Sequence, residues 1–214
     1  MKWEQAIKDY QLYLKIERGL SKNTIESYSN DLLKLINYLK SNEISQSPIQ
    51  INKSTLQQFV YDISKIVNTR SQARILSALR SFFDYLIFED YRSDNPTDLI
   101  ESPKIGRKLP DTLSEDEIDL LIKAIDLSHP QGERNRAIIE IMYGCGLRVS
   151  ELIQLKISDL FFAEGFIKVL GKGNKERFIP IHQVAQKYIQ NYQKYSRIHI
   201  EPKKEFVDTL FLNR

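Results

Sequence analysis

Three prolines at seven-residue intervals, Pro96, Pro103 and Pro110, lie together near the middle of this 214-residue chain. Proline lacks a backbone donor and disfavours helical backbone in the residue before it, so we expect no helix to cross this segment. We interpret residues 91–111 as an extended linker between two domains of ordinary size. The chain is therefore predicted to fold as two bodies rather than one.

Residues 1–90 have the apolar periodicity of helices. Apolar residues recur every three or four positions in four stretches, and turn or polar residues separate the stretches. The second stretch follows Ser21, a residue type that caps helices, and the fourth runs from about Thr69 to Glu89. Four helices with short links predict a small bundle with its own core.

The second half opens with a helix-capping signal. Ser114 and Glu117 form the S-x-x-E pattern of a capping box ahead of an apolar helical stripe. The acids between Asp111 and Asp119 suit the positive end of such a helix. A metal-binding acid cluster is the alternative interpretation, but capping already accounts for these acids.

Helix and strand signals then follow one another. A helix is predicted over about residues 134–143, and a short one after Ser150. Two runs rich in β-forming residues, 161–170 and 177–181, flank a turn that contains glycine. This arrangement predicts a β-hairpin.

The composition excludes several classes of protein. Hydrophobic residues make up 42% of the chain and charged residues 28%, which fits a folded chain rather than a disordered one. No apolar run approaches the ~20 residues that a membrane helix needs. The single Cys145 excludes an internal disulfide framework and agrees with a reducing cytoplasm, so we predict a cytoplasmic protein. With one cysteine and three histidines, no structural zinc site is expected.

The net charge of +3 does not by itself identify a nucleic-acid partner. Residues 1–110 hold 16 basic and 13 acidic residues, whereas residues 111–214 hold 15 of each. A DNA-binding chain of this composition would have to gather its basic groups on particular faces.

The predicted helix over residues 69–89 has a polar side opposite its apolar side. Four residues share the polar side: Arg70, Arg74, Ser77 and Ser81. Two guanidinium groups and two hydroxyls can bond phosphates and base edges in a major groove, and a solvated helix face is the alternative. Lys22 and Thr24, at the start of the second helix, are candidates for further phosphate contacts.

Arg148 follows a turn that contains Gly144 and Gly146, and both glycines are expected to break the preceding helix. The planar fork of an arginine suits a bidentate grip on the non-bridging oxygens of a phosphate. Glu151 lies three residues later on the same helical face and is able to orient that fork. An ordinary surface salt bridge is the alternative interpretation of this pair.

Lys172 stands between two glycines in the predicted hairpin turn. The neighbouring cations Lys168, Lys175 and Arg177 are expected to lower the pKa of Lys172, which would make it a usable general acid near neutral pH. A solvated basic turn is the alternative.

Together, GLRVSEL and the later turn GKGNKER, behind a four-helix domain and a proline-rich linker, resemble the tyrosine recombinases of the phage integrase family, and most closely the Xer recombinases. The resemblance covers essentially the whole chain, including TRSQARILSALRSFFDYL and NPTDLIESPKIGRKLP. It implies a mainly α fold. Residues 1–90 would form a four-helix SAM-like core-binding domain, and residues 112–214 the first part of a mixed α+β catalytic domain with a small β-hairpin sheet.

The resemblance also implies a chemistry. In this family a tyrosine attacks a DNA phosphate and forms a 3′-phosphotyrosyl link, without a metal or nucleotide cofactor. Arg148 matches an arginine that stabilises the pentavalent phosphate, Lys172 matches the acid that protonates the leaving oxygen, and Glu151 matches a supporting acid. Lys175 and Arg177, from the same turn as Lys172, are predicted to bind DNA.

The implied partners are a double-stranded DNA recombination site and other recombinase protomers, which form a tetramer on two sites. A second Xer recombinase and a DNA translocase are further expected partners, because Xer recombinases resolve chromosome dimers at cell division. No membrane partner is expected.

The family's second arginine, in an H-x-L-R-H-like motif, and its tyrosine have no counterpart after Lys172. We therefore expect a catalytic domain that is truncated and inactive alone, with VDTLFLNR as a strand of that domain. Truncation would leave apolar faces uncovered on residues 134–143 and 210–212, so residues 1–90 should fold independently and the second half should be marginal. The alternatives are a naturally short DNA-binding regulator, a fragment of a mobile-element integrase, or a helical interaction scaffold.

Overall fold

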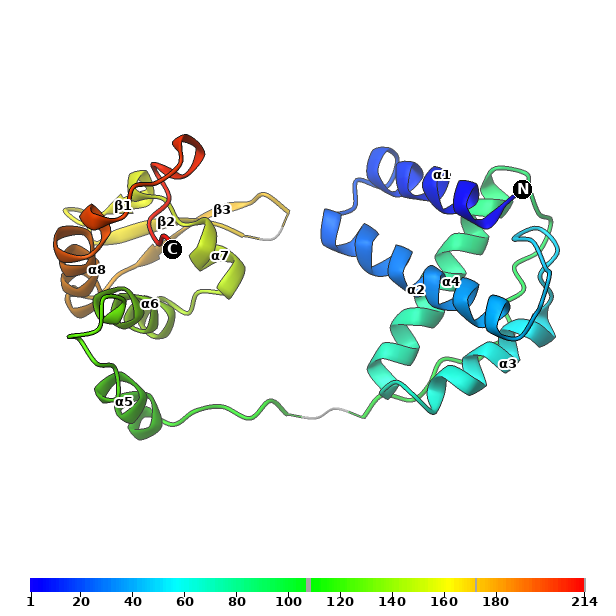
Figure 1. Ribbon diagram of the computed structural model, residues 1–214, viewed down its shortest axis with the longest axis horizontal. Coiled ribbons are helices and arrows are strands. Elements are labelled where there is room, and N and C mark those ends of the chain that lie inside the picture. Colours follow the sequence, from blue (N-terminus) through cyan, green and yellow to red (C-terminus); the bar gives the residue numbers. More distant parts are fainter. Residues whose placement is uncertain (107–108, 172, 214) are drawn as a thin grey trace. The chain divides into compact units, whose positions relative to one another are not determined.

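The computed structural model describes residues 1–106, 109–171 and 173–213. It divides into two compact units, Met1–Leu109 and Pro110–Arg214 (Figure 1). Helices are the main regular elements of both units, and the second unit also holds a three-stranded sheet. The predicted class, mainly α with a small sheet, is confirmed. Within the described residues, no helix is long and apolar enough to cross a membrane.

The first unit contains four helices: α1 (Trp3–Ile16), α2 (Lys22–Ser41), α3 (Lys53–Ser64) and α4 (Thr69–Phe88). The last three begin at capping residues. Ser21, Asn52 and Asn68 each accept the backbone N–H of the residue three positions on. The third helix begins at Lys53, directly after the Asn52 cap.

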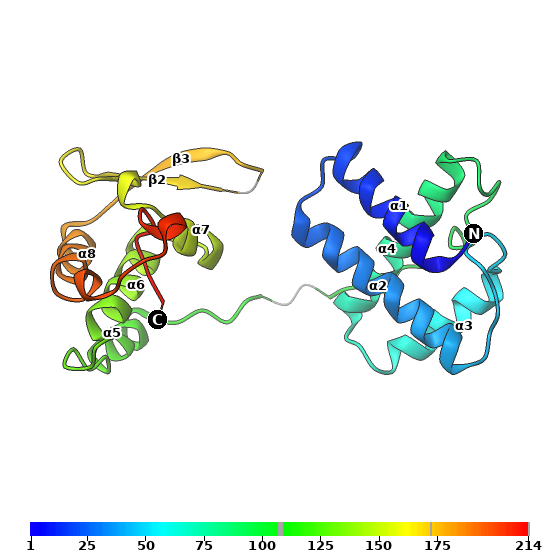
Figure 2. The same ribbon diagram turned by 45° about the horizontal axis from the view of Figure 1, so that its top comes forward.

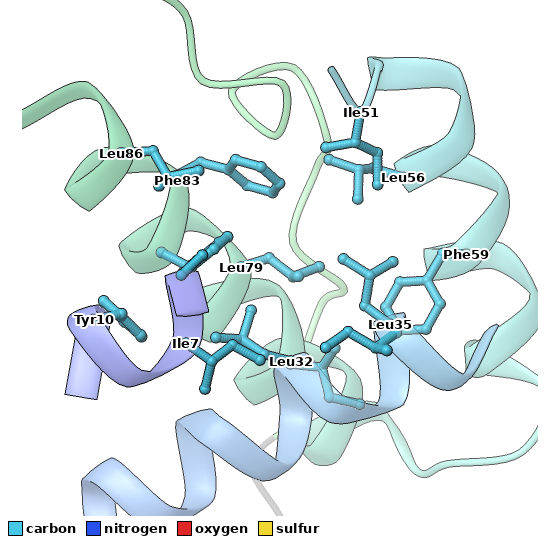
Figure 3. Packing of buried hydrophobic residues seen from close by; sticks show 14 of the residues in the cluster. Ile7, Tyr10, Leu32, Leu35, Ile51, Leu56, Phe59, Leu79, Phe83 and Leu86 are labelled. Atoms are coloured by element: carbon cyan, nitrogen blue, oxygen red, sulfur yellow. The ribbon is translucent and has the colours of Figure 1, made fainter. Parts of the chain in front are cut away.

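All four helices contribute to one core, with α4 packed against the other three. Figure 3 shows side chains of α1, α2 and α3 directed toward Leu79 and Phe83 of α4. The rings of Tyr10 and Phe82 meet edge to face with centroids 5.3 Å apart, a favourable aromatic geometry. The predicted bundle thus has a continuous apolar interior.

The segment after α4 packs against the bundle. The prolines predict an extended linker from residue 91, but the Arg92 side chain is buried and donates to the carbonyls of Pro48, Ile49 and Ile51. Ile100 is part of the core. The segment is irregular, as the prolines require, but its backbone and side chains find partners on the first unit.

The second unit begins with the helices α5 (Glu115–Lys123), α6 (Gly132–Cys145) and α7 (Val149–Gln154). A later helix, α8 (Gln183–Tyr195), packs against α6. Ser114 and Glu117 form the predicted capping box at the start of α5. The helix α6 continues through Gly144 to Cys145 and is capped by Gly146, whose φ of 60° is left-handed, so only the second of the two glycines terminates it.

The sheet lies between α7 and α8 in the sequence and has the order β1 (Leu160–Phe161), β2 (Phe166–Leu170), β3 (Glu176–Pro180). Both pairs are antiparallel, so the predicted hairpin is confirmed as β2–β3, and β1 is an added third strand. Ile167 and Val169 of β2 are buried in the core of this unit. The hairpin extends beyond α7 in both views (Figures 1 and 2).

Two expectations about the last segment are wrong. Residues 207–213 form no strand, and only Thr209 makes a β-bridge, to Lys156. Leu210 and Leu212, expected to be uncovered, are buried. They are buried because the segment returns to the core, where the Leu212 N–H donates to the Tyr192 hydroxyl.

Exposed apolar surface in the second unit lies elsewhere. A groove of about 840 Å³ runs between α7 and the segment after α8. Its apolar lining includes Ile153, which is 60% exposed, and Phe206, which is 47% exposed. This groove was not among the faces expected to be uncovered. Of residues 134–143, Ala137 and Ile141 are buried and Tyr143 is 53% exposed, so that part of the expectation holds only at Tyr143.

Candidate functional site

Arg148 directly precedes α7 and is bound to Glu151 both through its backbone and through one nitrogen of its guanidinium. Its backbone N–H donates to Oε2 of Glu151 at 2.9 Å, and its Nη1 donates to Oε1 of the same residue at 3.0 Å. The Arg148 side chain is nevertheless 71% exposed. The guanidinium is thus oriented from one side and open to a ligand on the other.

Glu151 is the centre of the cluster. Its side chain is only 3% exposed and accepts four N–H groups, two from Arg148 and two from Arg177. Arg177 binds it in a bidentate manner, with Nη1 2.7 Å from Oε1 and Nη2 3.0 Å from Oε2. These Arg177 hydrogen bonds, followed by the Arg148 backbone N–H, lower the pKa of Glu151 to about 2. The buried carboxylate is therefore ionised at neutral pH.

Arg177 reaches Glu151 across the first residue of the hairpin turn. A Cβ added to Gly171 would lie 2.8 Å from Nη1 of Arg177 and 3.4 Å from the Lys175 carbonyl oxygen. The sequence marks Gly171 only as a turn glycine. Its steric role depends on a contact between the turn and β3, which no local pattern indicates.

Lys172, the predicted general acid, lies outside the described residues. Two of the cations expected to lower its pKa are already paired. Lys168 lies 3.4 Å from both Asp159 and Glu176, and its own pKa is raised, most strongly by Asp159. Arg177 is paired with Glu151. Only Lys175 remains exposed among the three.

The four predicted residues of α4 are not equally accessible. Arg70 and Ser77 are exposed, although the Ser77 hydroxyl donates to the Ala73 carbonyl within the helix. Ser81 is half-buried and lies beside the Tyr10 hydroxyl inside the bundle. The predicted polar side is therefore correct at its N-terminal end and turns inward at Ser81.

Arg74 is half-buried because it forms an ion pair with Asp31 of α2, a carboxylate with no exposed surface. Lys34 binds the other oxygen of Asp31 at 2.9 Å. Sequence reasoning missed Asp31. The available signal was its place on the apolar stripe of α2, between Tyr28 and Leu35, where a charged side chain requires a partner.

The candidates at the start of α2 also differ. Lys22 is exposed, with Nζ 3.7 Å from a carboxylate oxygen of Glu26, a spacing that leaves its ammonium largely free. The Thr24 hydroxyl lies 2.9 Å from the Ser21 hydroxyl and takes part in the helix cap. Lys22 is thus the more accessible of the two.

No group of three or more metal-ligating side chains occurs among the described residues. Cys145 is buried, and burial raises its pKa to about 11, so its thiol is protonated at neutral pH and is a poor nucleophile. The chemistry that this geometry supports is the binding of an anionic group at Arg148.

The comparison with protein families matches both units. Residues 7–90 match the phage integrase N-terminal SAM-like domain, and residues 111–214 match the phage integrase family. The tyrosine recombinase XerD of Oceanobacillus iheyensis is 40% identical over 212 residues, which are 99% of this chain and 71% of that relative. The chain belongs to the phage integrase family of tyrosine recombinases. A second XerD, from Staphylococcus aureus strain N315, is 37% identical over 98% of this chain and 71% of its own length.

Solved recombinase structures share the fold. XerH bound to a palindromic difH substrate, in a post-cleavage complex, has a TM-score of 0.70 and 24% identity over 97% of this chain and 61% of its own. A lambda integrase tetramer bound to a Holliday junction has a TM-score of 0.70 and 19% identity, over 91% of this chain and 57% of its own. The SAM-like and recombinase parts of the predicted fold class are thereby confirmed.

Proposed function

We propose that this tyrosine recombinase chain takes part in site-specific recombination through a 3′-phosphotyrosyl intermediate, in the resolution of chromosome dimers at cell division. The observation that carries the proposal is the Arg148 guanidinium, which a buried, ionised Glu151 holds through Nη1 while the Arg148 side chain stays 71% exposed and accessible to a phosphate. The XerD relatives, 40% and 37% identical over nearly the whole chain, support the specific role.

In the proposed mechanism, Arg148 donates two N–H groups to the non-bridging oxygens of the scissile phosphate. This contact stabilises the charge that develops on the pentavalent phosphorus, a contribution of about 10²–10³-fold for one well-placed donor. Glu151 orients Arg148, and Lys172 protonates the leaving oxygen. No metal takes part.

The two units have separate roles in this proposal. Residues 1–90 form the core-binding domain, in which Arg70, Lys22 and Ser77 contact DNA. Residues 112–214 form the first part of the catalytic domain, in which Lys175 contacts the backbone near the cleavage position. Arg74 and Thr24 remain candidates, but each must leave an existing partner to reach DNA.

The proposed partners are a double-stranded recombination site and further recombinase protomers. The lambda integrase neighbour is a tetramer on a Holliday junction, and the XerH neighbour is bound to its difH site, so we propose a tetramer on two duplex sites. A second Xer recombinase and a DNA translocase complete the proposal, with the cytoplasm as the compartment.

Residues 1–214 hold no counterpart of the family's second arginine motif or its tyrosine. We propose that these residues alone bind DNA without cleaving it. Incubation with a nicked suicide substrate is expected to give no covalent complex, whereas a polypeptide that also carries those motifs should give one. A phosphotyrosine linkage formed by residues 1–214 would contradict the proposal.

DNA binding itself is tested by its salt dependence. For residues 1–214 on duplex DNA, the logarithm of the affinity should fall linearly with the logarithm of the salt concentration, by about 0.9 for each phosphate contact. Arg70→Ala should reduce that slope by about 0.9, and the matched change Lys8→Ala on α1 should leave it unchanged. A salt-independent affinity would favour an interaction scaffold that does not bind nucleic acid.

A further inference from the structure

Glu151 is a single negative charge between two guanidinium groups. The Glu151 side chain is 3% exposed, that of Arg177 40% and that of Arg148 71%. Two cations and one anion leave a net charge of +1 in the cluster. The accessible part of that charge is at Arg148, because Arg177 is the more buried and more fully bonded of the two cations.

Arg177 occupies both carboxylate oxygens of Glu151. Arg148 consequently makes only one side-chain hydrogen bond to Glu151, through Nη1. Its remaining guanidinium N–H groups are free to bind another oxyanion. If Arg177 were absent, the buried carboxylate of Glu151 would need another strong hydrogen-bond donor. Arg148 already contacts Glu151 and could supply it.

We propose that Arg177 is a positioning residue, which satisfies Glu151 so that Arg148 keeps its charge and donors for the DNA phosphate. This inference rests on the proposed function of Arg148. It replaces the prediction that Arg177 contacts DNA directly. Without Arg177, Arg148 would close onto Glu151 as a neutral pair and lose its affinity for phosphate.

The role requires arginine and the adjacent glycine. Only a guanidinium offers two parallel N–H groups to one carboxylate, so a lysine at this position would satisfy one oxygen and leave the other. Gly171 leaves the space that Nη1 of Arg177 fills. Arg177→Lys is therefore expected to give a partial defect, between that of the wild type and that of Arg177→Ala.

The test compares the salt dependence of duplex binding for residues 1–214 and four variants: Arg148→Ala, Arg177→Ala, Arg177→Ala with Glu151→Gln, and Arg177→Ala with Glu176→Gln. Arg177→Ala and Arg148→Ala should each reduce the slope of log affinity against log salt concentration by the same amount, about 0.9. Adding Glu151→Gln removes the competing carboxylate charge and should restore the wild-type slope. Adding Glu176→Gln to Arg177→Ala changes the net charge by the same amount as Glu151→Gln does. Because it leaves Glu151 in place, it should not restore the slope.

If the Arg177→Ala and Glu151→Gln double variant binds as weakly as Arg177→Ala, then Arg177 contacts DNA itself and the inference is wrong. Equal restoration by Glu176→Gln would show a general charge effect and would also overturn it. Thermal melting of each variant separates these outcomes from unfolding, and the Arg177→Lys variant provides a second, milder case.

A crystal structure of Arg177→Ala decides the inference without DNA. Arg148 should turn to make two side-chain hydrogen bonds with Glu151, and an unmoved Arg148 would overturn the proposal. The two proposals can fail separately. If the Arg148→Ala variant binds DNA as well as the wild type, the proposed phosphate contact is wrong. If Arg148 nevertheless turns toward Glu151 in the Arg177→Ala crystal structure, the positioning role of Arg177 is still supported.

Discussion

At the scale of single residues, one buried carboxylate organises the candidate site. Glu151 holds the backbone and side chain of Arg148 on one side and the guanidinium of Arg177 on the other. Gly171 lies against the same group, since a Cβ there would be 3.6 Å from Oε1 of Glu151. The space at Gly171 and the ionisation of Glu151 can each be tested separately.

Gly171→Ala should displace Arg177 from Glu151, because the added methyl group would lie 2.8 Å from Nη1. The guanidinium is the end of a flexible side chain and can move, so the cost in folding free energy should be small, on the order of 1 kcal/mol. The pKa of Glu151 should rise from about 2 toward 4.5, as followed by NMR titration of its carboxyl carbon. Gly106→Ala, at a position with no neighbouring atom within 4 Å, is the control and should change neither quantity.

The depressed pKa of Glu151 also predicts how stability depends on pH. The folded-state pKa of about 2 lies below the ordinary value of 4.5, so the folded state favours the ionised form. This stabilisation is fully present above about pH 4.5 and is lost as the pH falls toward 2. Urea denaturation of residues 1–214 should show that the free energy of unfolding of the second unit declines as the pH is lowered between these values. The Glu151→Gln variant should lack this decline. A decline of equal size in Glu151→Gln would contradict the assignment, and Glu164→Gln, at an exposed position, is the control.

At the scale of elements, an ion pair joins the two longest helices of the first unit. Asp31 on α2 is fully buried and pairs with Arg74 on α4 and with Lys34 on its own helix. Both cations keep an exposed part, so the cost of desolvation falls mainly on the carboxylate. The pair fixes how α4, the helix with the predicted DNA contacts, lies against α2.

Asp31→Ala should destabilise the first unit by about 1–3 kcal/mol. This is less than the loss of one partner of a wholly buried pair, because the Arg74 and Lys34 side chains are 41% and 38% exposed and can be hydrated. Chemical denaturation monitored by circular dichroism would measure the change. Asp62→Ala, which removes a more exposed acid of α3, should cost less, and an equal loss would argue against a special role for Asp31.

At the scale of the whole molecule, the two units have separate cores, and the segment after α4 belongs to the first. A fragment of residues 1–109 should therefore be more stable than one of residues 1–90. The burial of Ile100 alone contributes about 1.5–3 kcal/mol. Thermal melts of both fragments would measure the difference. Equal stability would show that the packing of residues 92–100 adds nothing, and Ile100→Ala within residues 1–109 would locate the effect.

The features that depend on local patterns were predictable from the sequence alone. The four helices, the Ser114 capping box, the β2–β3 hairpin and the two recombinase motifs follow from periodicity, capping chemistry and short spacings along the chain. Arg148 directly precedes the short helix α7 and Glu151 lies three residues later in its first turn, so their contact was predictable as well.

Which charged side chains are exposed and which are paired depends on contacts between residues far apart in the sequence. Asp31 and Arg74 are 43 residues apart, Glu151 and Arg177 are 26 apart, and Arg92 reaches carbonyl groups more than 40 residues earlier. The sequence pattern places a side chain on a face but does not identify the partner that packing brings to it. A buried carboxylate must be paired because its desolvation is costly, so the fold, rather than the local pattern, assigns Arg74 to Asp31 and Arg177 to Glu151.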